Sequence, residues 1–98
     1  LVKDKIALFP DAPTERGTRH IIELIKALEE GYNSTIIFII QRDDAIYFSP
    51  NEKTDKKFST NLKIAKKKGV VIRALTNRVF ILKNNLFIEP SIEAKLKI

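Results

Sequence analysis

Two short, continuous runs of apolar and β-branched residues, 35–41 and 70–75, constrain the fold most. Runs of this length without polar alternation are typical of strands covered on both faces of a parallel sheet. The segment from about Asp55 to Lys68 lies between them and has helical spacing on its apolar side. That side carries Phe58, Leu62 and Ala65. Strand, helix and strand in this order predict a right-handed βαβ unit with two parallel strands.

A further helix is predicted from about Thr14, its N-cap, to Glu30, with Gly31 after its last turn. Its apolar stripe consists of Ile21, Leu24, Ile25 and Leu28. Gly17 lies on the same side, where glycine costs a helix about 1 kcal/mol relative to alanine. We therefore expect another part of the chain to approach Gly17 closely.

The remaining elements are shorter. Residues 3–9 suggest a strand, and 43–51 a loop anchored by the packing of Tyr47 and Phe48. Residues 79–83 and 86–89 flank Asn84-Asn85, which predicts a hairpin, and the tail from Pro90 is weakly specified. The order α-β-α-β-β predicts one α/β domain over residues 1–98, with a thin sheet that strands of a larger domain would complete.

Composition excludes several classes of function. The 98 residues contain no Cys and one His, which rules out a thiol nucleophile, a Cys-ligated zinc site and a His-rich metal site. The longest apolar run is far shorter than the roughly 20 residues that span a membrane. The net charge is +6, and residues 53–83 hold ten basic residues and one acid.

Such a basic segment attracts polyanions, although a lysine-rich helix can also serve only to keep a protein soluble. The candidate phosphate contacts are Lys56, Lys57, Lys63, Lys66, Lys67, Lys68 and Arg73. Among the aromatic residues only Phe58 interrupts the basic run, and its spacing assigns it to the core. The sequence therefore does not predict a platform for base stacking.

No catalytic motif is complete in this chain. There is no glycine-rich phosphate loop and no Gly-x-Ser-x-Gly nucleophile elbow. A metal-dependent nuclease needs an acid followed on the next strand by an acid-x-Lys triplet. Pro10-Asp11 resembles the first half, but the triplets at 55–57 and 93–95 lie in a predicted helix and in the tail. We assign no catalytic residue and no metal ligand.

The sequence allows two interpretations for each of two polar residues, His20 and Arg42. His20, four residues after Arg16 on the flank of its helix, either bonds a neighbouring strand or loop or contacts phosphate or a metal-bound water. Arg42 follows Gln41 at the carboxyl end of a strand, where α/β sheets present binding groups. It either has a function or bridges to Asp43, Asp44 or the first helix.

Three segments carry a resemblance to a known family: FPDAPTERGTRHIIEL at 9–24, IIFIIQRDDAIYFSPN at 36–51 and KIAKKKGVVIRAL at 63–75. In this order they resemble the sugar fermentation stimulation protein family, over residues 1 to about 83. The residues that carry the family pattern are Asp11, Thr14, Arg16, Gly17, His20, Gln41 and Arg42.

The resemblance implies a cytoplasmic DNA-binding protein that affects sugar (maltose) metabolism, with an N-terminal OB-like domain and a C-terminal domain resembling PD-(D/E)XK nucleases. This chain would be the back half of that nuclease-like domain. The acid and the Glu-x-Lys element would lie upstream of Leu1. Arg16 and His20 would then be auxiliary to the site, and Mg²⁺ or Mn²⁺ would belong to the full-length protein.

Three hypotheses follow. The first is a DNA-binding module, the second is the non-catalytic remainder of a metal-dependent nuclease, and the third is a piece that only completes a sheet. Whether the protein is an enzyme stays open. The expected partners are DNA and the OB-like domain, without a membrane, and a homo-oligomer is a further alternative.

Overall fold

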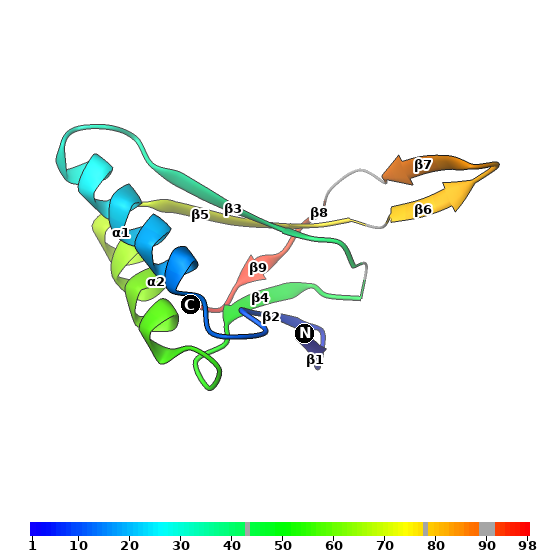
Figure 1. Cartoon of the computed structure of the whole chain (residues 1–98), viewed down its shortest axis with the longest axis horizontal. Helices are drawn as coiled ribbons and strands as arrows, with labels where there is room; N and C mark the ends of the chain where they lie inside the picture. Colours follow the sequence, from blue (N-terminus) through cyan, green and yellow to red (C-terminus); the bar gives the residue numbers. More distant parts are fainter. Residues whose placement is uncertain (43, 78, 89–91) are drawn as a thin grey trace.

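Two helices and two main sheets share one core in the computed structural model (Figure 1), over its described residues. The structure describes residues 1–42, 44–77, 79–88 and 92–98, with the backbone alone over 79–82 and 85–88. The elements in chain order are β1 (Val2–Lys3), β2 (Ile6–Phe9), α1 (Glu15–Glu29), β3 (Thr35–Ile40), β4 (Tyr47–Pro50), α2 (Lys56–Lys68), β5 (Val71–Thr76), β6 (Val79–Leu82), β7 (Asn85–Ile88), β8 (Ile92–Glu93) and β9 (Lys95–Leu96).

The strands form a four-stranded sheet in the order β1-β2-β4-β9, a three-stranded sheet in the order β3-β5-β8, and the hairpin β6-β7. Strands β3 and β5 are parallel and pair from Thr35 opposite Val71 to Ile40 opposite Thr76. The predicted βαβ unit is confirmed, with the additional strand β4 between β3 and α2. The helices lie side by side at one end of the molecule, and the hairpin extends from the other (Figure 1).

Both helices begin and end close to where the sequence predicts. The Thr14 hydroxyl oxygen accepts a hydrogen bond from the Gly17 amide at 3.0 Å, and the Asp55 carboxylate accepts one from the Phe58 amide at 2.9 Å. These are N-caps, which satisfy amides that have no partner in the first helical turn. Gly69 ends α2 with a φ of 110°, a conformation that glycine adopts without strain.

The core consists of aromatic and aliphatic side chains from both sheets and both helices. Phe48 and Phe58 are almost fully buried, and the Phe38 ring stacks on Phe48 with centroids 4.5 Å apart. The expected close approach at Gly17 is confirmed. A Cβ atom there would lie 2.9 Å from Thr14 Cγ2 and 3.1 Å from Phe58 Cε2.

The prediction that the first apolar strand is covered on both faces was wrong. Ile37 and Ile39 on β3 are 48% and 55% exposed, whereas Phe38 between them packs against the core. The core lies against one face of the β3-β5-β8 sheet, so the alternate residues of β3 point away from it. Strand β3 is also an edge strand of that sheet.

Several shorter elements also differ from the expectation. The presumed strand 3–9 is the antiparallel pair β1 and β2, the presumed loop 43–51 contains β4, and the tail contains β8 and β9. The hairpin turn is Lys83-Asn84, both with positive φ, because Leu82 pairs with Asn85. The expectations for residues 89–91 lie outside the described residues.

Candidate nucleic-acid interface

The lysines of α2 do not share one side of the helix. At about 100° per residue, four of them fall within an arc of about 100° on the flank away from α1. We call them the lysine flank: Lys56, Lys63, Lys66 and Lys67. Lys57 and Lys68 lie on the side toward α1, where the Lys68 ammonium is 3.0 Å from a carboxylate oxygen of Glu29. Arg73 lies on β5, away from the helix.

Carboxylates from other elements pair with three of the seven candidates. Lys68 is the first of the three. The second is Lys63, whose Nζ is 3.6 Å from Glu52 Oε2. The third is Arg73, whose Nε is 2.6 Å from Glu93 Oε1. The side chains of the Lys63 and Arg73 pairs are about half exposed, and surface ion pairs of this kind contribute roughly 0–1 kcal/mol to the free energy of unfolding. The other four lysines form no ion pair with any described residue. The structure therefore brings together a subset of the predicted contacts and separates Arg73 from them.

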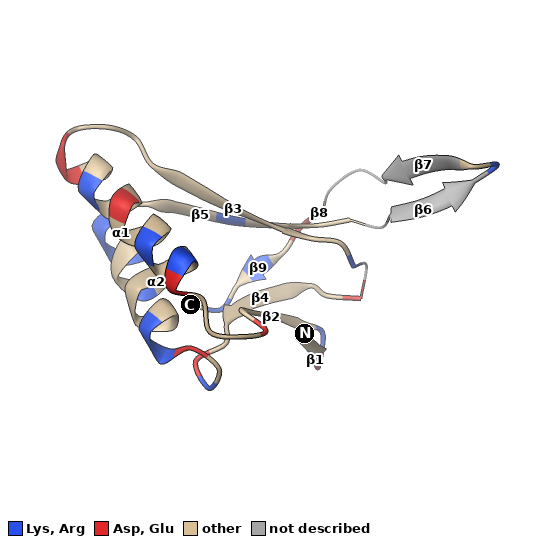
Figure 2. Ribbon diagram, in the orientation of Figure 1, with Lys and Arg blue, Asp and Glu red and all other residues tan. Residues whose placement is uncertain are grey.

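The lysine flank borders a hollow. A depression of about 440 Å³ is lined by Lys63, Lys66, Lys67 and the C-terminal residue Ile98. Figure 2 shows basic residues along α2 and at β9, whereas α1 carries acidic and basic residues together. Helix α2 contains six lysines and no acid, so the positive potential of the molecule is concentrated on this side.

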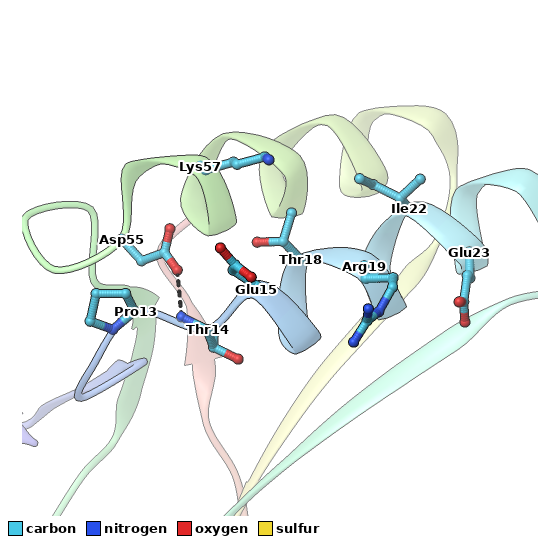
Figure 3. Close-up of a pocket in the computed structure, with 9 residues that line it drawn as sticks. All are labelled: Pro13, Thr14, Glu15, Thr18, Arg19, Ile22, Glu23, Asp55 and Lys57. Carbon is cyan, nitrogen blue, oxygen red and sulfur yellow. Dashed lines mark hydrogen bonds between the residues drawn. The ribbon is translucent and has the colours of Figure 1, made fainter.

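A second pocket, of about 460 Å³, lies between the N-terminal halves of α1 and α2 (Figure 3). It is lined by three acids and two bases, namely Glu15, Glu23, Asp55, Arg19 and Lys57. Charges this balanced give a phosphate no net attraction. This pocket is therefore a weaker candidate for nucleic-acid binding than the lysine flank.

Asp55 holds the two helix N-termini together at that pocket. One carboxylate oxygen accepts from the Phe58 amide, and the other accepts from the Thr14 amide at 2.8 Å, the bond drawn in Figure 3. The hydrogen bond from Phe58, and next the one from Thr14, holds the pKa of this carboxyl below its usual value. Asp55 thus couples the family-pattern residue Thr14 to the helix that carries the lysine flank.

The other family-pattern residues have different surroundings. Asp11 and Arg42 line one cleft of about 280 Å³, together with apolar residues of β2 and β3. The Arg42 guanidinium donates to both carboxylate oxygens of Asp44, at 3.0 and 2.6 Å, which lowers the pKa of that carboxyl. The bridge to Asp44 is thus confirmed, while Asp43 lies outside the described residues. Gln41 is exposed beside Arg42.

Arg16 and His20 are both exposed on α1 rather than at its buried boundary. His20 makes no hydrogen bond with the described part of the chain, and both interpretations of its role stay predictions. Among the described residues, no three or more His, Asp or Glu side chains lie together where they could hold a metal ion. The described residues therefore do not by themselves form a metal site of the nuclease type.

The contact between Lys97 and the Tyr47 ring was not predicted from the sequence. The Lys97 ammonium lies 4.3 Å from the centroid of the Tyr47 ring, although the two residues are fifty positions apart in the chain. Tyr47 is half-buried on the face of β4 opposite Phe48, so it does not anchor a loop from the core side. The pairing of β4 with β9 brings the two residues together, and the short strand β9 was not expected.

The fold is matched over its whole length by a solved structure, Pyrococcus furiosus SfsA in complex with Ca²⁺. The TM-score is 0.87 and the identity 36%, with 100% of this chain and 41% of that chain covered. The chain therefore has the nuclease-like α/β fold predicted from its sequence.

The family follows from sequence comparison. The family model described as the sugar fermentation stimulation protein RE domain matches residues 1–81. A sugar fermentation stimulation protein homolog from Sulfolobus acidocaldarius is 52% identical over 89 residues, covering 86% of this chain and 40% of that protein. One from Ruminiclostridium cellulolyticum is 57% identical over 75 residues, covering 76% and 33%. The chain belongs to the sugar fermentation stimulation protein family, and it spans two fifths or less of the length of these relatives.

Among the described residues, no helix is long and apolar enough to cross a membrane.

Proposed function

We propose that this chain binds DNA through phosphate contacts made by the lysine flank of α2. The observation that carries the proposal is the hollow lined by Lys63, Lys66 and Lys67, on a helix that contains no acid. Ammonium groups that follow one side of a helix can contact successive phosphates of a single backbone. Phosphate contacts carry no sequence information by themselves, so binding should differ little between unrelated DNA sequences.

The proposed DNA-binding surface contains fewer residues than the sequence predicted. Lys56, Lys63, Lys66 and Lys67 belong to it, whereas Lys57 and Lys68 face α1 and Arg73 lies on β5. The ion pair between Lys63 and Glu52 is long and exposed, so a phosphate can replace the carboxylate at little cost.

We infer the biological setting from the family. A DNA-binding member would act in the regulation of sugar metabolism, maltose metabolism included. A protein that binds chromosomal DNA works where the DNA is, so the proposal places the chain in the cytoplasm. The relatives are more than twice as long as the matched region, which leaves room in the longer protein for the rest of a nuclease-like domain and for an OB-like domain.

A matched pair of double variants tests the phosphate contacts. Lys66→Gln/Lys67→Gln removes two charges from the lysine flank, and Lys57→Gln/Lys68→Gln removes two from the opposite side. The first should weaken binding to several unrelated duplexes by about tenfold, and the second by about twofold or less. Equal losses in the two variants would show that only net charge matters and would defeat the proposal.

The cleft along β3 supports a second candidate function, the completion of a sheet. Strand β3 is an edge strand, and four consecutive residues of it, from Ile37 to Ile40, line the cleft opposite β2. An apolar cleft beside unpaired strand amides is suited to a further strand that would join the two sheets. In the longer protein the β3 amides should then exchange hydrogen more slowly than in this chain alone, and equal exchange would contradict sheet completion.

The metal-dependent nuclease stays a proposal for the longer protein. The Pyrococcus relative was solved in complex with Ca²⁺, but this chain matches only 41% of it. Cleavage of DNA that needs Mg²⁺ or Mn²⁺ is expected of the longer protein and not of this chain. Cleavage by the longer protein that survives loss of its upstream Glu would count against this alternative.

A further inference from the structure

The outer face of the β1-β2-β4-β9 sheet carries lysines around a tyrosine. Cα pairing aligns four residues in one row across the strands, and residues paired in this way point to the same face. The row consists of Lys3, Ile6, Tyr47 and Lys95. Because Phe48 and Pro50 are buried on the other face of β4, this row faces away from the core. None of its members is acidic.

Lys97 connects this face to the lysine flank. It lies two residues after Lys95 in an extended segment, so its side chain points to the same face as that of Lys95. The Lys97 amide donates to the Phe48 carbonyl at 2.7 Å, which holds the segment beside β4. The next residue, Ile98, lines the hollow with Lys63, Lys66 and Lys67. The chain therefore passes from the Tyr47 face, at Lys97, to the edge of the lysine flank, at Ile98.

The chemistry of this sheet face fits a single strand better than a duplex. The Lys97 ammonium over the Tyr47 ring shows that one ring face can receive a partner. Proteins that bind single-stranded nucleic acid combine aromatic rings, on which bases stack, with ammonium groups that hold the phosphates. Bases within a duplex are already stacked on one another and cannot reach such a ring.

We propose that this sheet face binds a single-stranded segment of nucleic acid, with one base stacked on Tyr47 and its backbone continuing past Lys97 onto the lysine flank. The proposal rests on the proposed function, because the same α2 lysines hold the phosphates. It adds a base contact and a preference for unpaired bases.

The two tyrosines and the absence of Trp allow a direct spectroscopic test. Tyr32 lies beyond the end of α1 and is 67% exposed. In Tyr32→Phe, all tyrosine fluorescence comes from Tyr47. A thymidine oligonucleotide should quench that fluorescence, whereas inorganic polyphosphate, which has charges and no bases, should leave it nearly unchanged. Equal quenching by the two probes would overturn base stacking.

Affinity measurements separate this inference from the proposed function. Tyr47→Leu should weaken binding of the thymidine oligonucleotide by about tenfold, from a stacking energy of about 1–3 kcal/mol per base. Its affinity for duplex DNA should change by less than about twofold. Tyr47→Phe, which keeps the ring, should retain binding, and Tyr32→Leu is the matched control.

Unchanged oligonucleotide affinity in Tyr47→Leu would overturn the inference. If Lys66→Gln/Lys67→Gln still weakened duplex binding in that case, the proposed function would stand without the base contact. If the double lysine variant also bound normally, both proposals would fail.

Discussion

Asp55 shows how one carboxylate can serve two helices. It caps α2 through the Phe58 amide and reaches across to the Thr14 amide before α1. Asparagine keeps one acceptor oxygen and is itself a good N-cap, but its amide nitrogen cannot accept the second bond. Asp55→Asn therefore isolates the link between the helices. We expect it to lower the midpoint of thermal unfolding by about 5 °C near neutral pH.

The same link has a defined pH dependence. Because the pKa of Asp55 is lower in the folded state than in the unfolded one, its stabilisation is complete above about pH 4, the unfolded pKa. It is lost as pH falls through the lower folded pKa. Urea unfolding at a series of pH values gives the free energy of unfolding of wild type and of Asp55→Asn. The difference between these two free energies should be constant above about pH 5 and should shrink below about pH 4. A constant difference throughout the acid range would contradict the assignment.

Gly17 is the other residue whose role follows from contacts. Alanine would improve helix propensity by about 1 kcal/mol, but its Cβ would press on the capping side chain of Thr14. We expect Gly17→Ala to destabilise the fold by about 1–2 kcal/mol net in urea unfolding. In a Thr14→Ala background the same change should cost less, because the crowded atoms are gone. If Gly17→Ala instead raised the free energy of unfolding, the atoms around Gly17 would have moved at little cost to make room for the Cβ atom.

At the scale of elements, alternation along β4 decides which side chains matter for stability. Phe48 faces the aromatic core and Tyr47 faces outward. Phe48→Ala should cost about 3–5 kcal/mol in the free energy of unfolding, and Tyr47→Ala about 1 kcal/mol or less. Similar costs at the two positions would mean that the face assignment of β4 is wrong.

The elements predicted from sequence are those with long, local signals. The helices were found from apolar spacing and, for α1, from the Thr14 cap, and β3 and β5 were found from their β-branched runs. Strands β4 and β9 are short and pair in parallel with partners distant in the chain, so no local pattern marks them. The positions of the α2 lysines on the helix were predictable. Their pairing with Glu52 and Glu29 was not, since those acids come from other elements.

At the scale of the whole molecule, charge is segregated. The net charge is +6, and Lys63, Lys66 and Lys67 of α2 lie beside the C-terminal residue Ile98, in a segment that also carries Lys95 and Lys97. The neighbouring helix α1 carries both acidic and basic residues and therefore attracts a polyanion weakly. This asymmetry should orient an approaching nucleic acid toward the lysine flank before any contact forms.

Salt dependence tests the central claim, that phosphates bind the lysine flank, most directly. For wild type, Lys66→Gln/Lys67→Gln and Lys57→Gln/Lys68→Gln, the affinity for one duplex would be measured over a series of salt concentrations. With about four phosphate contacts, the logarithm of the wild-type affinity should fall with a slope of about −3 to −4 against the logarithm of salt concentration. The slope should become shallower by about 2 in the flank variant only. A flat wild-type response, or the same slope in all three proteins, would contradict the account.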